Sequence, residues 1–343
     1  MSRRFLLVAI GCLMSASAGG QTPTTVAPVY VEPLQDPATW TTAEPDDMVL
    51  YGTDTMQGSY PICPPTSPAA EKMGNLIPPG ARQGFFQKAN ASVTWMPRLE
   101  GDSLGVTAIQ TNIVTAVPFP HRYTPLTITP EYTLRLLDGP DFIDVPSRLH
   151  DLSVGFNHIR PLNDKWVFNG RVSLGLYGDD YSLDASDAFR ASGYAMGIHQ
   201  KTPNSPHKWI VGVAYFNRAG MSVFPVAGYM YKTEDLQVDV TFPRPKIAWR
   251  TWAEGCAGYN ERWWYISGDF GGGIWAVQRD SGADDTLSYS DIRVLVGTER
   301  IRIGHLSTRL EFGYVFAREL EYDSMSSELA VDDSIFVRGA LRY

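Results

Sequence analysis

Hydrophobic and polar positions alternate with a period of two over most of the chain after about residue 85. In residues 126–136, leucine, isoleucine and tyrosine interleave with threonine, glutamate and arginine, and residues 166–177 and 306–316 repeat the pattern. A run of about 9–11 residues is what a tilted strand needs to cross a membrane, whereas a strand of a soluble sandwich is nearer five or six residues. The length of the runs therefore favours membrane-spanning strands.

The pattern predicts an all-β fold, a transmembrane antiparallel β-barrel of 12–14 strands. An even number is expected of a bacterial single-chain barrel. Pro225, Pro243 and Pro245 interrupt the middle of the pattern, where proline is awkward in a paired strand, so 12 strands is the alternative to 14. The expected strands are 84–96, 104–117, 125–136, 149–159, 166–177, 189–200, 208–217, 223–231, 236–242, 246–257, 263–278, 288–298, 304–317 and 334–343.

The connections between these strands alternate in length, as they do in outer-membrane barrels with short periplasmic turns and longer extracellular loops. The short ones are 160–164, 201–207, 232–235, 259–262 and 299–303. The longer ones are 137–148, 178–188, 279–287 and 318–333.

The four longer connections are acidic and hold almost no lysine or arginine, while the short turns carry both signs. Clustered carboxylates at an outer mouth would concentrate cations, bind Ca²⁺ or Mg²⁺ loosely, or simply keep the loops solvated. The acids are Asp138, Asp141, Asp144, Asp179, Asp180, Asp184, Asp187, Asp280, Asp284, Asp285, Glu319, Glu321, Asp323, Glu328, Asp332 and Asp333.

The last predicted strand is apolar on one face and basic on the other, and it ends on an aromatic residue. Gly339, Leu341 and Tyr343 lie on one face, and Arg338 and Arg342 on the other. Such a strand suits lipid outside and a polar lumen inside. We expect Gly339, Leu341 and Tyr343 to form an assembly signal that the barrel-assembly machinery engages.

The chain begins like an exported protein. Arg3 and Arg4 precede a short apolar run, and small residues follow at 16–18, which is typical of a cleaved signal peptide over residues 1–18. Residues 19–82 are rich in proline and threonine and predict an irregular periplasmic arm, followed by the barrel over 83–343. The predicted location is the outer membrane of a Gram-negative-type envelope, with its lipids as partners.

The inward faces of the predicted strands carry charges of both signs. In a barrel of 12–14 strands these residues either line a channel or pair to close it, and the arm could also enter as a plug. Aromatic residues near strand ends, including Tyr177, Trp263 and Trp275, are expected to form interfacial girdles. The candidate lumen charges are Glu131, Arg135, Arg171, Arg293, Arg309, Glu311, Arg338 and Arg342.

Several phrases of the sequence resemble an uncharacterised family of bacterial outer-membrane barrel proteins, known only as a domain of unknown function. They are residues 86–99, 166–179, 224–229 and 240–243. The resemblance covers about residues 85–343. It implies a barrel in the outer membrane and no activity or functional residues.

Chemical motifs are absent. No nucleophile elbow, HExxH pair or phosphate loop occurs, so we expect no catalytic residue, no cofactor and no metal site. His158 on a lipid-facing position leaves a distant lipid-modifying alternative. Cys63 and Cys256 are either bridged or free, since export permits a disulfide.

Charge excludes one class of partner. Removing residues 1–18 takes away Arg3 and Arg4 and no acid, so the net charge falls from −8 to −10. An acidic chain does not suit nucleic acid. Two functions remain: a passive or weakly selective channel that favours cations or small solutes, and a non-conducting structural or surface-interaction barrel.

Overall fold

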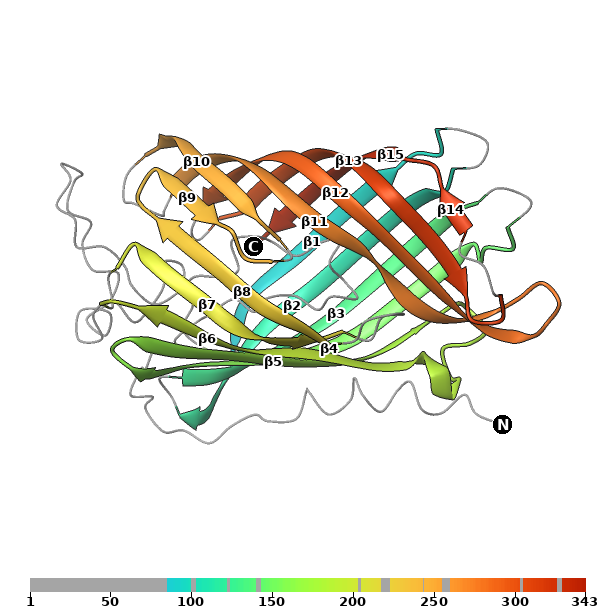
Figure 1. Ribbon diagram of the computed structural model, residues 1–343, viewed down its shortest axis with the longest axis horizontal. Coiled ribbons are helices and arrows are strands. Elements are labelled where there is room, and N and C mark those ends of the chain that lie inside the picture. Colours follow the sequence, from blue (N-terminus) through green and yellow to red (C-terminus); the bar gives the residue numbers. More distant parts are fainter. Residues whose placement is uncertain are drawn as a thin grey trace.

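The fold is a single antiparallel sheet that closes into a β-barrel (Figure 1). The computed structural model describes residues 85–343 apart from 100–102, 122–123, 140–142, 203–204, 217–222, 243, 255–259, 303–304 and 326–328. The predicted signal peptide, the predicted arm, Cys63, Cys256, Asp141 and Glu328 lie outside these residues. No helix in the described part of the chain is long and apolar enough to span a membrane.

Fifteen strands and one short 3-10 helix, η4 (Ser186–Ala188), make up the regular structure of the described residues. The strands are β1 (Phe86–Met96), β2 (Gly105–His121), β3 (Thr124–Asp138), β4 (Arg148–Asn163), β5 (Trp166–Gly178), β6 (Phe189–Gln200), β7 (His207–Tyr215), β8 (Val223–Lys232), β9 (Leu236–Asp239), β10 (Lys246–Ala253), β11 (Asn260–Gln278), β12 (Asp284–Arg302), β13 (Ser307–Tyr322), β14 (Leu329–Val331) and β15 (Ser334–Arg342).

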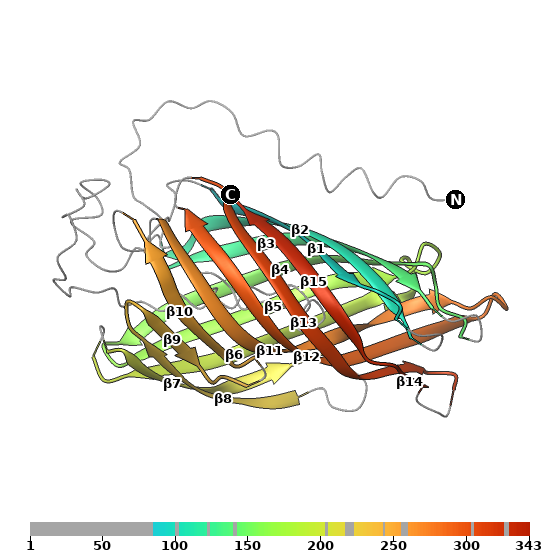
Figure 2. The same cartoon turned by 90° about the horizontal axis from the view of Figure 1, so that it is seen from above.

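The ring contains 14 of these strands, β1 to β13 and β15. Each pairs with its neighbour in the chain, and β15 joins β13 to β1, where Asn90 lies opposite Arg342. The short β14 pairs only with the far end of β13 and stands outside the ring. The predicted barrel and its upper strand count are confirmed. Figure 2 shows the strands running obliquely around the barrel.

The two ends of the barrel differ. At one end, here called the short-turn end, lie the tight connections between β4 and β5 and between β12 and β13, together with the C-terminus. At the other, the long-loop end, lie the connections after β3, β5, β11 and β13. The predicted alternation of short and long connections holds at β3–β4, β5–β6 and β13–β15, but the connection after β11 spans only residues 279–283 and is shorter than predicted.

Two sets of boundaries differ from the predictions. β9 has only four residues and ends at Asp239, because Pro245 lacks a backbone donor and lies just before β10. The hairpin of β11 and β12 instead pairs without interruption as far as Gln278 and Asp284. In addition, β13 continues to Tyr322. Four acids expected in loops consequently lie in strands: Asp284, Asp285, Glu319 and Glu321.

Candidate functional site

The barrel turns apolar side chains outward and charged side chains inward. Exposed large apolar residues occur on strands all around the ring, among them Val93, Ile113, Leu152, Val172, Val211, Ile266, Phe312 and Leu341. Nine basic and eight acidic side chains of the described residues are buried. A soluble protein shows the reverse arrangement. The interior is nearly neutral, so the acidic excess of the chain lies elsewhere.

The predicted lumen charges lie on this interior. Arg342 is partly buried at the short-turn end, and the others are buried: Glu131, Arg135, Arg171, Arg293, Arg309, Glu311 and Arg338. The sequence prediction missed their acidic partners Asp151, Asp269, Asp291 and Glu299. Strand parity would have found Asp291 and Glu299, which share a face of β12 with Arg293.

Glu311 is the centre of one interior network. The Tyr265 hydroxyl donates to its Oε1 over 2.6 Å, and Arg338 Nη1 donates to its Oε2 over 2.8 Å. Arg338 also lies 3.7 Å from Asp269, which pairs with Arg244 at 2.8 Å. These contacts link β11, β13, β15 and the segment just before β10 across the interior, and paired charges can remain buried where single ones cannot.

Two carboxylates of β12, those of Glu299 and Asp291, accept hydrogen bonds from further arginine side chains. Glu299 Oε1 accepts from Arg309 over 3.2 Å and from Arg342 over 3.0 Å. Asp291 accepts two bonds of 2.6 Å from Arg293, and neither side chain is exposed. The same carboxylate accepts from the backbone N–H of Gly271 over 3.1 Å. The second half of β11 is therefore bonded to β12 by the Asp291 side chain as well as by the backbone hydrogen bonds between the two strands.

At the long-loop end the wall folds inward, and two strands that are not neighbours in the ring meet. Ala276 of β11 pairs with Gly178 of β5, and the Asp179 N–H donates to the Ala276 carbonyl over 3.1 Å. Asp179 Oδ2 in turn accepts from the Gln278 N–H over 2.8 Å. Residues 271–277 of β11 are buried without alternation, as expected of a strand covered on both faces.

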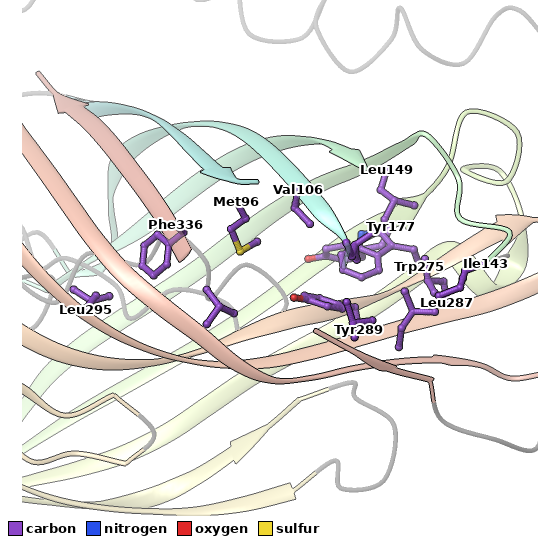
Figure 3. Close-up of a cluster of buried hydrophobic side chains, with 14 of the residues drawn as sticks. Met96, Val106, Ile143, Leu149, Tyr177, Trp275, Leu287, Tyr289, Leu295 and Phe336 are labelled. Atoms are coloured by element: carbon purple, nitrogen blue, oxygen red, sulfur yellow. The ribbon is translucent and has the colours of Figure 1, made fainter. Parts of the chain in front are cut away.

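Side chains fill the space beside this contact. Trp275 Nε1 donates to Asp151 Oδ1 over 2.5 Å, and Asp151 Oδ2 accepts from Arg135 over 2.8 Å. The Arg135 guanidinium lies 5.3 Å from the centre of the Trp275 ring. Figure 3 shows Trp275 grouped with Tyr177, Tyr289 and Leu287 inside the barrel, all of them buried. We call Tyr177, Asp151, Trp275, Leu287 and Tyr289 the outer cluster.

Two arginines, Arg318 and Arg279, form hydrogen bonds and ion pairs with the connections at the long-loop end. Arg318 is buried and donates to the Leu104 carbonyl over 2.6 Å, the Asp332 carbonyl over 2.8 Å and the Tyr289 hydroxyl. Arg279 pairs with Asp144 at 2.9 Å and Asp285 at 3.3 Å. Burial acts to lower the pKa of Arg279, but the hydrogen bond with Asp144 and the nearby acids raise it above its usual value. The long-loop end is thus held together by specific contacts.

The acids predicted for the outer loops fall into two groups. Asp144, Asp179 and Asp285 accept bonds within the structure, Asp180 accepts from His150 at 2.7 Å, and Asp138 lies 3.6 Å from Arg98. The other exposed acids are Asp184, Asp187, Asp280, Asp284, Glu319, Asp323, Asp332 and Asp333, of which Asp333 accepts from the Tyr314 hydroxyl over 2.6 Å; Asp138 and Asp180 are exposed too, and Glu321 is half-buried. In the described part of the chain, no group of three or more His, Cys, Asp or Glu could hold a metal ion.

The aromatic residues divide differently from the prediction. Trp95, Trp166, Trp209 and Trp264 are exposed on the outward face, but Tyr177, Trp263 and Trp275 are buried inside. Their strand parity matches inward residues such as Arg171 and Asp269 rather than the outward ones. The prediction of girdle positions for these three was wrong, because proximity to a strand end does not determine the face.

His158 lies opposite Leu126 on β3 and Gly170 on β5. Neither of these ladder partners is a nucleophile. The assembly residues Gly339, Leu341 and Tyr343 are exposed, and the Tyr343 backbone exchanges two hydrogen bonds with Ala89 of β1.

A glycine provides the room for one key contact. A Cβ on Gly297 would lie 2.3 Å from Cζ of Tyr265, the ring that reaches Glu311. We expect Gly297→Ala to lower the free energy of unfolding by about 1–3 kcal/mol through overpacking. Equilibrium unfolding in denaturant measures this, with Gly339→Ala as the control, since nothing lies within 4 Å of a Cβ there. Equal stability of the two variants would contradict the expectation.

One family model matches the chain, that of Domain of unknown function (DUF6268), over residues 143–333. The match covers 191 of 343 residues and runs from the loop before β4 to the loop before β15. The resemblance to a domain of unknown function is confirmed, over a shorter range than 85–343. No curated protein matches the chain.

Proposed function

The chain belongs to the family described as Domain of unknown function (DUF6268), and on that premise we propose an outer-membrane barrel that its own strands close at the outer end. Its role is structural or surface-interacting rather than that of an always-open channel. The long-loop end faces outward and the short-turn end faces the periplasm. Enzymatic activity is not part of the proposal.

The membrane location is supported by the outward surface. Leaving the outward apolar side chains in water would be costly, and burying them in lipid gives the usual free-energy gain for apolar area. The apolar outer face and charged inner face are the arrangement that a lipid-embedded barrel needs. Residues 1–18 add the export signal that such a location requires.

The closed state is supported by the meeting of β5 and β11. In an open channel these strands would stay on opposite walls, whereas here Ala276 pairs with Gly178 and the outer cluster fills the space beside them. An ion crossing this end would have to displace Trp275 from Asp151. The β5–β11 contact is the observation that carries the proposal.

Conductance in planar lipid bilayers tests it. We expect the wild type to give no steady conductance, and the double variant Asp179→Ala/Trp275→Ala to give stepwise currents, because it loses both the carboxylate that holds Gln278 and the ring beside it. The matched control is Asp184→Ala/Trp264→Ala, in which both residues are exposed. Heat-modifiable migration checks that each variant is folded.

Regular current steps from the folded wild type, as frequent as those of the double variant, would overturn the closed state. They would favour a second candidate, a passive channel that prefers cations. The specific support for that candidate is the set of exposed acids at the outer end, since the interior is close to neutral. Asp280→Asn with Asp284→Asn would then reduce the cation preference.

A further inference from the structure

Within the described residues, the barrel wall lacks backbone pairing at one place, between β8 and β11 on the side of the long-loop end. The β7–β8 ladder starts at Val223, whereas the β8–β9 ladder covers only residues 230–232, and two more backbone bonds extend it to Ala227. On the other side, β10 accompanies β11 only as far as Gly268, and β11 continues beside β12 to Gln278. The β9–β10 hairpin between them is short (Figure 1). The outer parts of β8 and β11 are thus neighbours without a described strand between them.

A proline lies on the edge of β8 at this place. The odd-numbered residues of β8 turn their backbone groups toward β9, since the carbonyls of Ala227 and Tyr229 accept hydrogen bonds from that side. Pro225 has no N–H to offer there, and proline occurs on strand edges for this reason. The proline that interrupts the hydrophobic pattern therefore lies where a further paired strand would have needed its donor.

Four phenylalanine rings cross this part of the wall, and we call them the phenylalanine row. Successive ring centres are 5.3, 6.5 and 5.8 Å apart. Rings that meet only through their faces and edges separate without the loss of a backbone hydrogen bond, which paired strands cannot do. The row consists of Phe216 after β7, Phe224 of β8, Phe242 in the loop between β9 and β10, and Phe270 of β11.

The loop between β9 and β10 is held more firmly to β11 than to β8. Arg244 pairs with Asp269 of β11 at 2.8 Å, and the Pro245 carbonyl accepts from the Gly268 N–H over 2.9 Å. Toward β8, the bond from the Phe242 N–H to the Ala227 carbonyl is 3.4 Å long. The widest step of the phenylalanine row, 6.5 Å, is also on this side, between Phe224 and Phe242. The weakest line in the wall therefore runs between β8 and this loop.

The inner wall behind the phenylalanine row is apolar, unlike the charged interior formed by β11 to β15. Its inward residues form one buried cluster, to which Phe216 belongs and against which Phe224 and Phe270 pack. The outward residues of β7 are apolar as well. A wall that is apolar on both faces suits an apolar molecule better than water or ions. The inward residues of the cluster include Ile198, Ile210, Ala214 and Val226.

We propose that the line between β8 and the β9–β10 loop is a lateral gate, which opens toward the lipid when Phe224 and Phe242 part. An uncharged apolar molecule dissolved in the membrane then passes between the lipid and the apolar inner wall without crossing the outer end. In this structure the phenylalanine row closes the gate. The inference rests on the membrane location and the closed outer end proposed above, and it gives the closed barrel a route of exchange through its side.

Labelling of single cysteines by a maleimide dissolved in the bilayer tests the gate. The folded full-length protein, with Cys12, Cys63 and Cys256 replaced by serine, is placed in lipid vesicles that contain pyrene maleimide. Ala214→Cys puts the thiol on the inner wall opposite Phe224, and Ala108→Cys puts it on the inner wall of β2, between unbroken ladders. The two alanines are equally buried. We expect Ala214→Cys to react about tenfold faster or more, because labelling follows the local opening of the wall.

Widening the gate should speed this reaction. We expect Phe242→Ala to raise the labelling rate of Ala214→Cys about threefold or more, because it removes the ring in the middle of the row and leaves the wall easier to open. Phe312→Ala is the matched control. Both rings are exposed, but Phe312 lies on β13 between two unbroken ladders, so its removal should leave the rate unchanged.

Val213→Cys, next to Ala214 on the outward face, separates this inference from the proposed location. It should react fastest, and its failure to react would overturn the membrane location and the gate together. If it reacts, but Ala214→Cys is as slow as Ala108→Cys with and without Phe242→Ala, the gate alone is overturned. Labelling of Ala214→Cys by a water-soluble sulfonated maleimide as fast as by pyrene maleimide would also overturn the gate, because the route would then lead through water.

Discussion

Glu311→Ala is expected to destabilise the folded barrel by about 3–5 kcal/mol, the cost of leaving one member of a buried ion pair without its partner. The glutamate accepts from Tyr265 and Arg338, and all three side chains are buried. After the substitution, Arg338 retains its 3.2 Å hydrogen bond to Thr94, and Asp269 at 3.7 Å is the acid of the described residues that still pairs with it. Equilibrium unfolding in denaturant, followed by tryptophan fluorescence in lipid vesicles, measures the loss.

Glu319→Ala is the matched control, because Glu319 lies on the same strand and is exposed. It should change stability by less than about 0.5 kcal/mol, as surface substitutions usually do. The double variant Glu311→Ala/Arg338→Ala should lose less than the sum of the two single variants, since it removes the unpaired charge along with its partner. Additive losses would show that the pair does not act as a unit.

Removing Tyr343 is expected to reduce the amount of barrel assembled into the membrane several-fold, with little effect on the properties of the barrel that does assemble. The Tyr343 backbone makes the last two hydrogen bonds of the β1–β15 seam, with Ala89, and the exposed ring lies on the outward face. Without them, the end of the seam exposes unpaired backbone groups at the membrane surface. Heat-modifiable migration of the membrane fraction measures the assembled amount.

Tyr343→Phe is the control, since it keeps both the ring and the backbone, and it should assemble as well as the wild type. Tyr343→Asp keeps the backbone but places a charge where the ring lies, so it separates the two contributions. Equal membrane yields of the deletion and the wild type would argue against a role for this residue in assembly.

Strand number and alternation could be predicted from the sequence because both depend on local order. A period of two determines which residues share a face of a strand. It predicts that Glu311 and Arg338 both face the interior, and in the structure they lie opposite each other on β13 and β15. The same rule applied to Tyr177 and Trp275 would have placed them inside. The girdle prediction uses only their nearness to a strand end, which does not determine the face.

The closure of the long-loop end could not be predicted in this way. Trp275 and Asp151 are 124 positions apart, and their contact depends on the register of every strand between them. The apolar outward residues of β11 give no sign that its far half bends toward β5. The acids at 284–285 and 319–321 lie in strands rather than in the predicted loops, since charge is a weak guide to where a hairpin ends.

The seam between β1 and β15 also governs the order in which the molecule can form. Arg338 meets Thr94 across this seam, 244 positions away in the chain. Bringing such distant segments together has a large entropic cost, and it is recovered only when both strands are present. A nascent chain therefore has no ring to close until its final strand is released. Until then the two edge strands, β1 and β13, need protection from pairing with another chain.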